Sequence, residues 1–312
     1  QLQLLPRYNA YLNIHFPANT EMYEKALERL KFEEFFLAQV RLGLIRFGRH
    51  RYSKGIVFNR VGELFHTFYK NHLPFELTGA QKRVLKEIRQ DTARGFQMNR
   101  LLQGDVGSGK TIVALLCMLL AADNGYQSCM MAPTEILAQQ HYNNIRELLK
   151  DMPVETALLT GSTSKAKRRE LLAKAADGSL HILTGTHALI EDQVQFHKLG
   201  FAVVDEQHRF GVAQRAKLWQ KGEVPPHVLV MTATPIPRTL AMTAYGDLDY
   251  SIMDELPPGR IPITTVHRYE TARSQVMDFI KAEIQQGRQA YIIFPLIEES
   301  EKMNYENLMK GY

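Results

Sequence analysis

The fold is decided by residues 104–111, which read Gly-Asp-Val-Gly-Ser-Gly-Lys-Thr. An apolar run typical of a strand precedes them (98–103), and an apolar run typical of a buried helix follows (112–122). Glycines lack a Cβ, so the backbone can curl and direct its N–H groups at one point, where the helix N-terminus adds partial positive charge. Strand, glycine loop and helix together predict a phosphate-binding loop.

Each residue of this loop has an expected role. Gly104, Gly107, Ser108 and Gly109 are expected to surround phosphate oxygens. Lys110 would reach the β and γ phosphates, and the hydroxyl of Thr111 would hold Mg²⁺. The alternative is a glycine turn that happens to precede a core helix.

The rest of the central region alternates between strand and helix patterns. Strands are expected near 98–103, 128–132, 156–159, 181–184, 200–204 and 228–231, and helices at 79–95, 112–122, 135–150 and 165–176. Such alternation is typical of a parallel sheet with helices on both faces, which binds ligands at the carboxyl ends of its strands.

The two ends of the chain have other patterns. Residues 1–19, with Pro6 and Pro17, are expected to be irregular, followed by a helix from about 21 to 48 and a shorter helical piece with a turn in 55–75. The proline-rich stretch 256–262 is typical of a linker before a strand (264–268), a helix (272–287) and a strand (289–295). We therefore expect three parts: a helical linker (1–75), an α/β lobe (76–258) and the start of a second lobe (259–312).

Composition limits the class of protein. Cys117 and Cys129 lie in apolar runs without CxxC spacing, which indicates reduced core residues of a cytosolic protein. The longest apolar stretch, 112–122, is too short to cross a bilayer, and no signal peptide is visible. We expect no membrane association.

Positive charge is concentrated at the start of the chain. Residues 1–75 carry 11 Lys and Arg against 6 Asp and Glu, a net charge of +5 that equals the net charge of the whole chain. Between Glu34 and Glu63 every charged side chain is basic: Arg41, Arg46, Arg49, Arg51, Lys54 and Arg60. A polyanion would bind such a stretch; a solvated helix face is the alternative.

Two further motifs follow apolar strands. Asp205 and Glu206 come directly after Val203-Val204, where a sheet of this kind manages Mg²⁺ and the attacking water. Asp205 would hold Mg²⁺ and Glu206 would deprotonate water; taken alone, such a pair is more often a turn. Thr232-Ala233-Thr234-Pro235 follows the next strand and could link the acidic pair to a neighbouring surface. A polar strand end before a proline turn is the alternative.

These signals, in this order, resemble superfamily 2 helicases and translocases of the DExH group, and in detail the RecG-type branched-DNA helicases. The resemblance extends to five other segments: Leu73-Pro74-Phe75-Glu76-Leu77-Thr78 with Gln81, Ala132–His141, Thr184–Ile190, Tyr291–Ser300, and Ile14-His15-Phe16-Pro17. It therefore spans nearly the whole chain and implies a RecA-like lobe followed by an incomplete second one.

The resemblance also implies roles for particular residues. Gln81 would bond the edge of adenine and Phe75 would stack on it, which implies ATP with Mg²⁺ as the cofactors. Gln207, His208, Thr232 and Thr234 would couple the nucleotide state to contacts between lobes. Thr134, Thr160, Gly161, Thr186 and His187 would meet the DNA backbone, and the basic helix with Lys165, Lys167, Arg168 and Arg169 could add phosphate contacts.

The implied activity is ATP-dependent remodelling of branched or duplex DNA at stalled forks and Holliday junctions, by a monomer in the bacterial cytoplasm at the nucleoid. A wedge domain would precede residue 1, and later lobe-two motifs with their arginines would follow residue 312. The chain as given is therefore expected to bind nucleotide, hydrolyse it poorly and not unwind DNA.

Three other interpretations are open. A transcription-repair coupling factor has a similar motor, although its acidic box usually has Glu in place of Gln207. A nucleotide kinase would not need Thr232-Ala233-Thr234. A pure DNA-binding module would leave Lys110, Asp205 and Glu206 unexplained.

Overall fold

The computed structural model describes residues 3–52, 55–206, 217, 221, 222, 224–234, 248–255 and 263–293. The chain divides into two compact units, Gln1–Gly259 and Arg260–Tyr312, which are described separately below.

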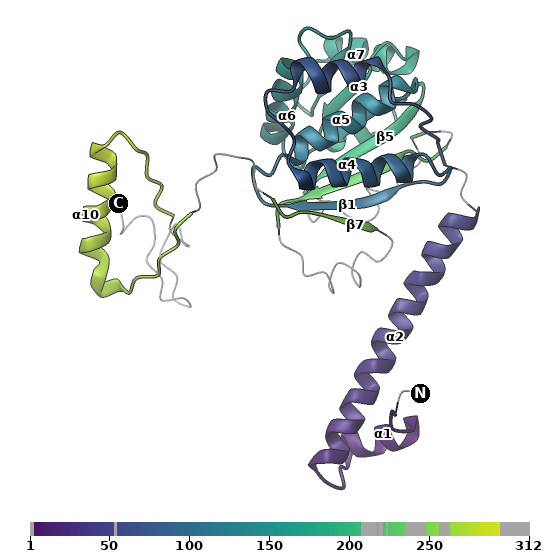
Figure 1. The fold of residues 1–312 in the computed structure, drawn as a ribbon, viewed down its shortest axis with the longest axis vertical. Helices are drawn as coiled ribbons and strands as arrows, with labels where there is room; N and C mark the ends of the chain where they lie inside the picture. Colours follow the sequence, from purple (N-terminus) through teal and green to yellow (C-terminus); the bar gives the residue numbers. More distant parts are fainter. Residues whose placement is uncertain are drawn as a thin grey trace. The chain divides into compact units, whose positions relative to one another are not determined.

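A seven-stranded parallel sheet forms the centre of the first unit (Figure 1). Its strands are β1 (Asn99–Gly104), β2 (Gln127–Met131), β3 (Thr156–Leu159), β4 (Ile182–Gly185), β5 (Leu199–Asp205), β6 (His227–Thr232) and β7 (Asp249–Met253). Their order across the sheet is β3-β4-β2-β5-β6-β1-β7, and every pairing is parallel. The six strands expected in the central region are all present.

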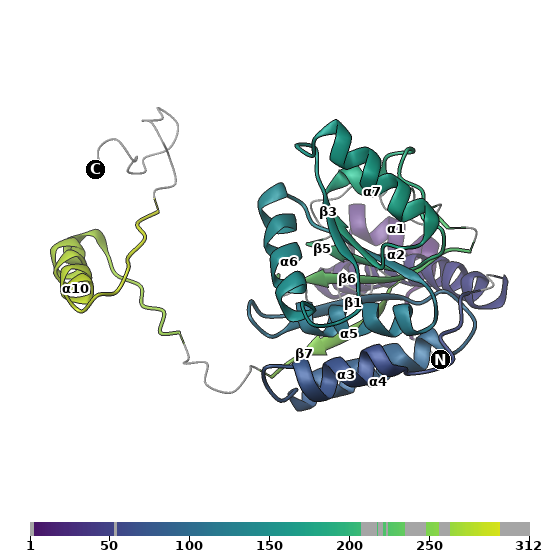
Figure 2. The same ribbon diagram turned by 90° about the horizontal axis from the view of Figure 1, so that it is seen from above.

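Successive strand residues pack into different cores, because side chains of a strand alternate between the two faces of the sheet. Phe201 and Val203 of β5 belong to one apolar cluster, and Ala202 and Val204 belong to the other. The helices that cover the first cluster are α3 (Glu63–Thr67), α4 (Gly79–Thr92), α5 (Lys110–Asp123) and α6 (Glu135–Leu148). The second cluster is covered by α7 (Lys165–Asp177) and a short 3₁₀ turn, η2 (His187–Ile190). In Figure 2, α4 and α5 lie on one side of the strands and α7 on the other. The predicted parallel sheet with helices on both faces is confirmed.

The helices of this unit begin at polar caps. Before α4 (Gly79–Thr92), Thr78 and Gln81 form a reciprocal capping box. The side chain of Thr134 accepts a hydrogen bond at the start of α6 (Glu135–Leu148), and Ser164 does so for α7 (Lys165–Asp177). Such caps satisfy backbone N–H groups that have no partner within the helix. The capped starts agree with the helix positions expected from the sequence.

Strand β7 was not expected from the sequence. An ion pair and a helix cap fasten it to α4: Arg83 bonds Asp254 at 2.7 Å, and the carboxylate of Glu255 accepts from the N–H of Ala80 at 3.0 Å. Beneath α4, the guanidinium of Arg100 on β1 donates to Asp91 of α4 and to Ser251 of β7. These polar contacts add to the parallel ladder between β7 and β1 and to the burial of Met253 in the core.

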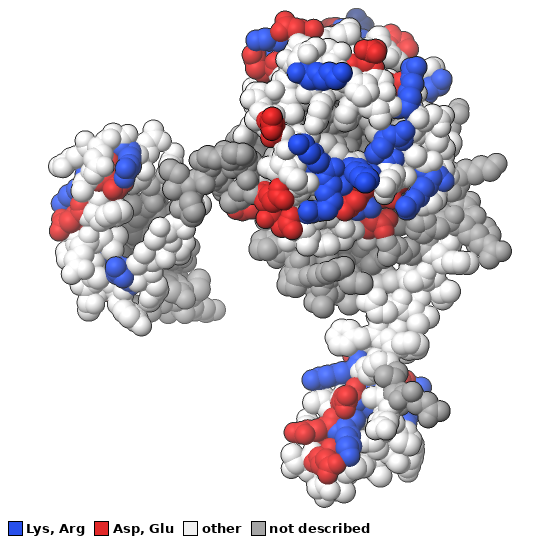
Figure 3. All heavy atoms as spheres, in the orientation of Figure 1, with Lys and Arg blue, Asp and Glu red and all other residues white. Residues whose placement is uncertain are grey.

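Two helices precede the sheet, α1 (Arg7–His15) and α2 (Thr20–Tyr52). The expectation that residues 1–19 are irregular was wrong, because Pro6 occupies the position before the first helical turn and Pro17 falls after the last one, so neither interrupts α1. Figure 3 shows acidic and basic side chains interspersed on α1 and α2, where Glu33 pairs with both Arg7 and Arg29 at 3.2 Å.

A carboxylate fastens the next helical segment, α3 (Glu63–Thr67) with the π-helical turn η1 (Phe68–His72), to the sheet unit. Asp123, the last residue of α5 (Lys110–Asp123), accepts from the backbone N–H groups of Gly62, Leu64 and Phe65, each at 3.0 Å. It caps α3 from a distance of about 60 positions along the chain, as the separations of these bonds show.

The second unit contains a 3₁₀ turn, η4 (Glu270–Ala272), and helix α10 (Arg273–Gln285), which agrees with the helix expected at 272–287. The strands expected at 264–268 and 289–295 do not form among residues 263–293. A strand requires ladder hydrogen bonds to a neighbour, and this part of the chain provides no such ladder. Residues 294 and 295, and the expected linker 256–262, lie outside the described residues.

Both cysteines are buried and free, as expected, and burial raises the pKa of the Cys129 thiol to about 12. None of the helices among the described residues is both long and apolar enough to cross a membrane.

Candidate nucleotide site and nucleic-acid edge

The glycine loop follows the end of β1 and leads into α5. Gly107 and Gly109 have φ angles of 77° and 87°, in the left-handed region that glycine adopts without strain. A Cβ on Gly109 would lie 2.3 Å from the side-chain nitrogen of Gln81, and a Cβ on Gly104 would lie 2.6 Å from the Oγ of Ser108. The loop therefore needs glycine at 107 for its conformation, at 104 for space, and at 109 for both reasons.

The loop has the features of a phosphate cradle. The Oγ of Ser108 is buried and has no hydrogen-bond partner among the described residues, which is unusual for a buried polar atom. The Nζ of Lys110 donates to the carbonyl oxygens of Gly104 and Asp105, at 2.7 and 2.8 Å. The ammonium is thus folded over the loop, where phosphate oxygens could replace the two carbonyls.

The charged side chains around Lys110 could bind both an anion, phosphate, and a cation, Mg²⁺. Burial lowers the pKa of Lys110, and the negative charges of Asp205, Glu206 and Asp105 oppose that shift. The acidic pair is therefore close enough to Lys110 to affect its titration. A hydroxyl on Thr111 and a carboxylate on Asp205 are oxygen ligands of the kind Mg²⁺ prefers, with substrate phosphate and water completing its shell.

Glu206 is held in a special conformation at the end of β5. Its φ of 51° is the only positive value among the described non-glycine residues. One carboxylate oxygen accepts from the N–H of Ala233 at 3.0 Å, and the other accepts from the hydroxyl of Thr232 at 3.2 Å. The same hydroxyl oxygen accepts from the N–H of Thr234 at 3.1 Å. Glu206 and the Thr-Ala-Thr segment thus form one hydrogen-bonded unit at the ends of β5 and β6.

The two residues expected at adenine lie in different environments. Gln81 is fully buried: its oxygen accepts from the N–H of Thr78, and its nitrogen donates to the carbonyl of Ser108 at 2.9 Å. Gln81 therefore fastens the glycine loop to the start of α4. Phe75 is 43% exposed and lines a hollow of about 470 Å³ together with Tyr69, Leu73, Pro74 and Lys82.

Residues expected at DNA and residues expected at the nucleotide follow different strands. Thr134 comes after β2, Thr160 and Gly161 after β3, and Thr186 and His187 after β4. These three strands are neighbours in one half of the sheet, whereas β5, β6 and β1 lead to the nucleotide residues in the other half. The carboxyl edge of the sheet is therefore divided between the two sets.

The five residues expected at DNA differ in their solvent exposure. Thr134, Gly161 and His187 are exposed, but Thr160 and Thr186 are only 5% and 2% exposed. The hydroxyl of Thr160 lies 2.9 Å from that of Ser162 and belongs to a local turn. The three exposed residues are thus the ones that a DNA backbone can reach.

One residue of this region had no assigned role in the sequence. The Nε2 of His141, on α6, lies 2.8 Å from the Oδ2 of Asp205, and both side chains are 12% exposed. The two residues are 64 positions apart, so no local pattern could reveal the contact.

Some expected residues are outside the described part or engaged elsewhere. Gln207, His208 and Lys54 lie outside the described residues, as do the side chains of Arg46, Arg49 and Arg51. Arg60, by contrast, donates to the carbonyl of Asp123 at 2.8 Å. On α7, Lys167 and Arg168 pair with Glu170 and Glu191.

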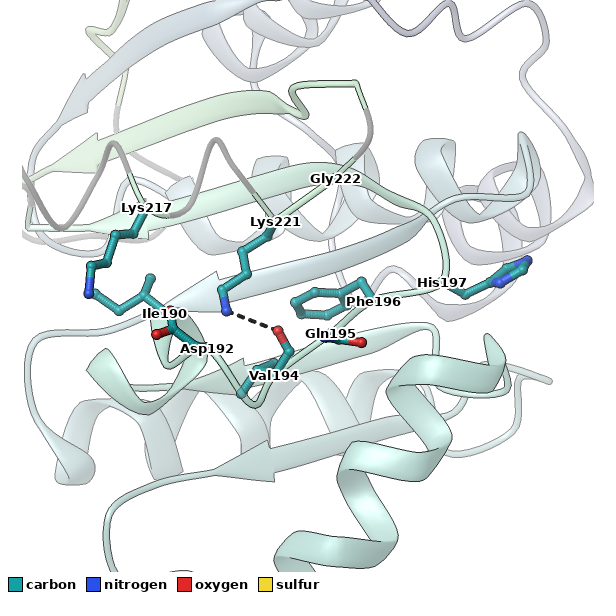
Figure 4. Close-up of a pocket in the computed structure, with 9 residues that line it drawn as sticks. All are labelled: Ile190, Asp192, Val194, Gln195, Phe196, His197, Lys217, Lys221 and Gly222. Atoms are coloured by element: carbon teal, nitrogen blue, oxygen red, sulfur yellow. Dashed lines mark hydrogen bonds between the residues drawn. The ribbon is translucent and has the colours of Figure 1, made fainter.

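A second hollow, of about 570 Å³, lies beside residues 190–197, which connect η2 to β5 (Figure 4). Lys221 extends into it and donates to the carbonyl oxygens of Val194, at 3.0 Å, and of Glu191. Its ammonium is thus used to fasten this connection. None of the residues lining the hollow belongs to the expected site.

The chain is similar to several known proteins. A family model described as DEAD/DEAH box helicase matches residues 78–243. The ATP-dependent DNA helicase RecG of Synechocystis sp. is 51% identical over 302 residues, which cover 97% of this chain and 36% of that protein. RecG of Aquifex aeolicus is 49% identical over 294 residues, 94% of this chain and 36% of that protein.

A solved structure supports the same grouping. The structure of RecG bound to a three-way DNA junction has a TM-score of 0.84 and 41% identity, and the match covers 95% of this chain and 40% of that one. The chain thus spans well under half the length of these relatives. Because the family model covers more than half of its 312 residues, the chain belongs to the DEAD/DEAH box helicase family.

Proposed function

We propose that this chain is the nucleotide-binding part of an ATP-dependent DNA helicase of RecG type, which remodels branched DNA such as stalled forks and Holliday junctions during recombination and repair. The observation that carries the proposal is that the glycine loop with Lys110 follows β1 while Asp205 and Glu206 end β5, at the same carboxyl edge of a parallel sheet. The similarity to RecG proteins over 94–97% of the chain supports the choice of RecG among helicases. We further propose that the protein acts as a monomer in the bacterial cytoplasm, at the nucleoid.

The proposed chemistry assigns a task to each residue of this site. Lys110 exchanges the carbonyls of Gly104 and Asp105 for phosphate oxygens of ATP. Thr111 and Asp205 would hold Mg²⁺, which neutralises charge on the phosphates. Glu206 orients water and accepts its proton.

Coupling to the rest of the motor follows from the contacts of Glu206. Because its carboxylate accepts from Thr232 and Ala233, a shift of that segment changes the direction of the base. We propose that Thr232 and Thr234, with Gln207 and His208, transmit contacts between lobes to hydrolysis in this way. Gln81 and Phe75 would recognise adenine; for Gln81 this requires a small rearrangement, since its amide supports the loop.

Nucleic acid is proposed to lie along the other half of the same edge. The exposed residues Thr134, Gly161 and His187 would contact the backbone of DNA, and the turns that contain Thr160 and Thr186 would shape that surface. Backbone contacts position a strand without reading its sequence, which suits an enzyme that acts on DNA by shape.

Substitution of Lys110 in the whole protein tests the proposal. Lys110→Ala should reduce DNA-stimulated ATP hydrolysis by at least about 10³-fold, because positioning and charge stabilisation are the main sources of catalysis in phosphoryl transfer. Lys150→Ala, which changes an exposed lysine of the same unit, is the control and should hydrolyse ATP normally. Unchanged turnover in Lys110→Ala would contradict the proposal.

The choice of DNA substrate separates RecG from its nearest alternative, a translocase of the transcription-repair coupling type. Hydrolysis by the whole protein should be stimulated more by forked DNA than by linear duplex or single strands. Equal stimulation by linear duplex, with displacement of stalled RNA polymerase, would favour the coupling factor.

A further inference from the structure

The contact between His141 and Asp205 joins a helix of the DNA half of the edge to a residue of the nucleotide half. A carboxylate only accepts hydrogen bonds, so the Nε2 of His141 carries the hydrogen and donates it across 2.8 Å. Both side chains are nearly buried, so water competes little for the bond. His141 lies on α6, which follows β2, and Asp205 ends β5, the neighbour of β2 in the sheet.

This bond restricts the carboxylate of Asp205. With Oδ2 held by the imidazole, rotation of the carboxylate about its own axis is hindered before any ion binds. A metal-binding carboxylate that is already oriented loses less conformational freedom on binding. Partners of this kind, behind the ligand itself, change metal affinity 10- to 100-fold in other proteins when removed.

The first turn of the same helix contacts the loop 160–163. The carboxylate of Glu135 accepts from the backbone N–H of Ser162 at 3.2 Å and from its hydroxyl at 2.8 Å. That loop contains Thr160 and Gly161, two of the residues proposed to lie at DNA. Helix α6 therefore holds the DNA-side loop at its first turn and Asp205 through its second turn.

We propose that His141 is a positioning residue: it orients Asp205 for Mg²⁺, and α6 carries displacements of the loop 160–163 to that carboxylate when DNA is bound. The inference rests on the proposed function, since it takes Asp205 as the metal-binding carboxylate. It adds a physical connection by which DNA can alter the affinity for Mg²⁺-nucleotide.

The test compares two substitutions of His141 in the whole protein. His141→Leu keeps an apolar side chain of similar size and removes the donor, whereas His141→Gln retains an N–H group at a similar reach. Binding of a fluorescent ADP analogue is titrated with Mg²⁺ and with EDTA, so no turnover is needed. His141→Leu should weaken binding about tenfold in Mg²⁺ and leave binding in EDTA unchanged; His141→Gln should restore most of the affinity.

A second measurement addresses α6. Forked DNA should change the affinity for Mg²⁺-ADP in the parent protein, and this change should shrink at least threefold in His141→Leu and in Glu135→Ala, which removes the acceptor for Ser162. Glu147→Ala, which removes an exposed carboxylate on the same helix, is the control and should keep the parent response.

Two outcomes would overturn the inference. Equal weakening of ADP binding in Mg²⁺ and in EDTA would mean that His141 acts through packing alone, and an unaltered DNA response in Glu135→Ala would mean that α6 is not the connection. Failure of the proposed function has a different signature: DNA-stimulated ATP hydrolysis would then be unchanged in Lys110→Ala, whatever His141 does.

Discussion

At the scale of single residues, the glycine loop depends on one position more than on the others. Gly109 has a left-handed φ of 87°. A Cβ added to Gly109 would also lie only 2.3 Å from the side-chain nitrogen of Gln81. Gly109→Ala should therefore both strain the backbone, by about 1–2 kcal/mol, and displace Gln81 from under the loop. We expect a lower melting temperature and at least about tenfold weaker nucleotide binding, measured by thermal unfolding and fluorescence titration.

Gly125 is the matched control for this substitution. Its φ is 78°, but a Cβ there would meet nothing within 4 Å. Gly125→Ala should lose stability through backbone strain alone and keep its affinity for nucleotide. If both variants bind nucleotide equally well, the contact between Gln81 and the loop does not contribute to nucleotide binding.

At the scale of elements, a buried histidine joins β6 to β1 and to the segment before α3. The Nδ1 of His227 accepts from the N–H of Met98, and its Nε2 donates to the carbonyl of Ile56, both at 2.9 Å. Burial lowers the pKa of His227 to about 4. The folded protein thus holds His227 neutral, whereas the unfolded chain binds a proton near the ordinary histidine pKa of about 6.5.

The stability of the sheet unit should therefore depend on pH. The contribution of neutral His227 is fully present above pH 6.5 and is lost as the pH falls toward 4, because the unfolded state then binds more protons. Between pH 7 and pH 5 the loss from this residue is about 2 kcal/mol in the free energy of unfolding. Urea unfolding should show a correspondingly smaller pH dependence in His227→Gln. His187→Gln, at an exposed position, is the control and should keep the pH dependence of the parent protein. If His227→Gln also keeps that pH dependence, the effect does not come from His227.

Elements with strong local patterns were predictable, and those fixed by distant partners were not. The loop 104–111 and strands such as β5 and β6 have apolar runs with a clear end, so sequence alone located them. Strand β7 has no such run, and its polar contacts with α4 come from Asp254, which pairs with Arg83, and from Glu255. The bond from His141 to Asp205 also joins distant positions. The strands expected at 264–268 and 289–295 had the right residues but no ladder partner among residues 263–293.

At the scale of the whole sheet unit, the division of the carboxyl edge predicts that DNA binding and nucleotide binding can be weakened separately. His187→Glu places a negative charge at the DNA half and should weaken binding of labelled DNA about tenfold at low salt, with less effect at high salt. Nucleotide affinity should remain within twofold of the parent. Fluorescence anisotropy over a series of salt concentrations measures the first effect.

Ser179 provides the control for that charge. It is exposed and precedes β4, so it lies at the amino end of the strands, away from the proposed DNA surface. Ser179→Glu should leave DNA binding unchanged. Equal weakening by both substitutions would mean that the added charge repels DNA wherever it is placed, and the divided edge would lose its support.

The strand order of the sheet also has a consequence for the order of assembly during synthesis. Strands β3, β4, β2 and β5 pair among themselves, so that half is complete once residue 205 has left the ribosome. Strand β1 pairs only with β6 and β7, Asn99 with Val228 and Arg100 with Asp249. At about 5–20 residues per second, β1 waits roughly 6–26 s for its first partner. The four-stranded part β3-β4-β2-β5, which α5 contacts through β2 and β5, can therefore form first, and β1 with the glycine loop that follows it gains a sheet partner last.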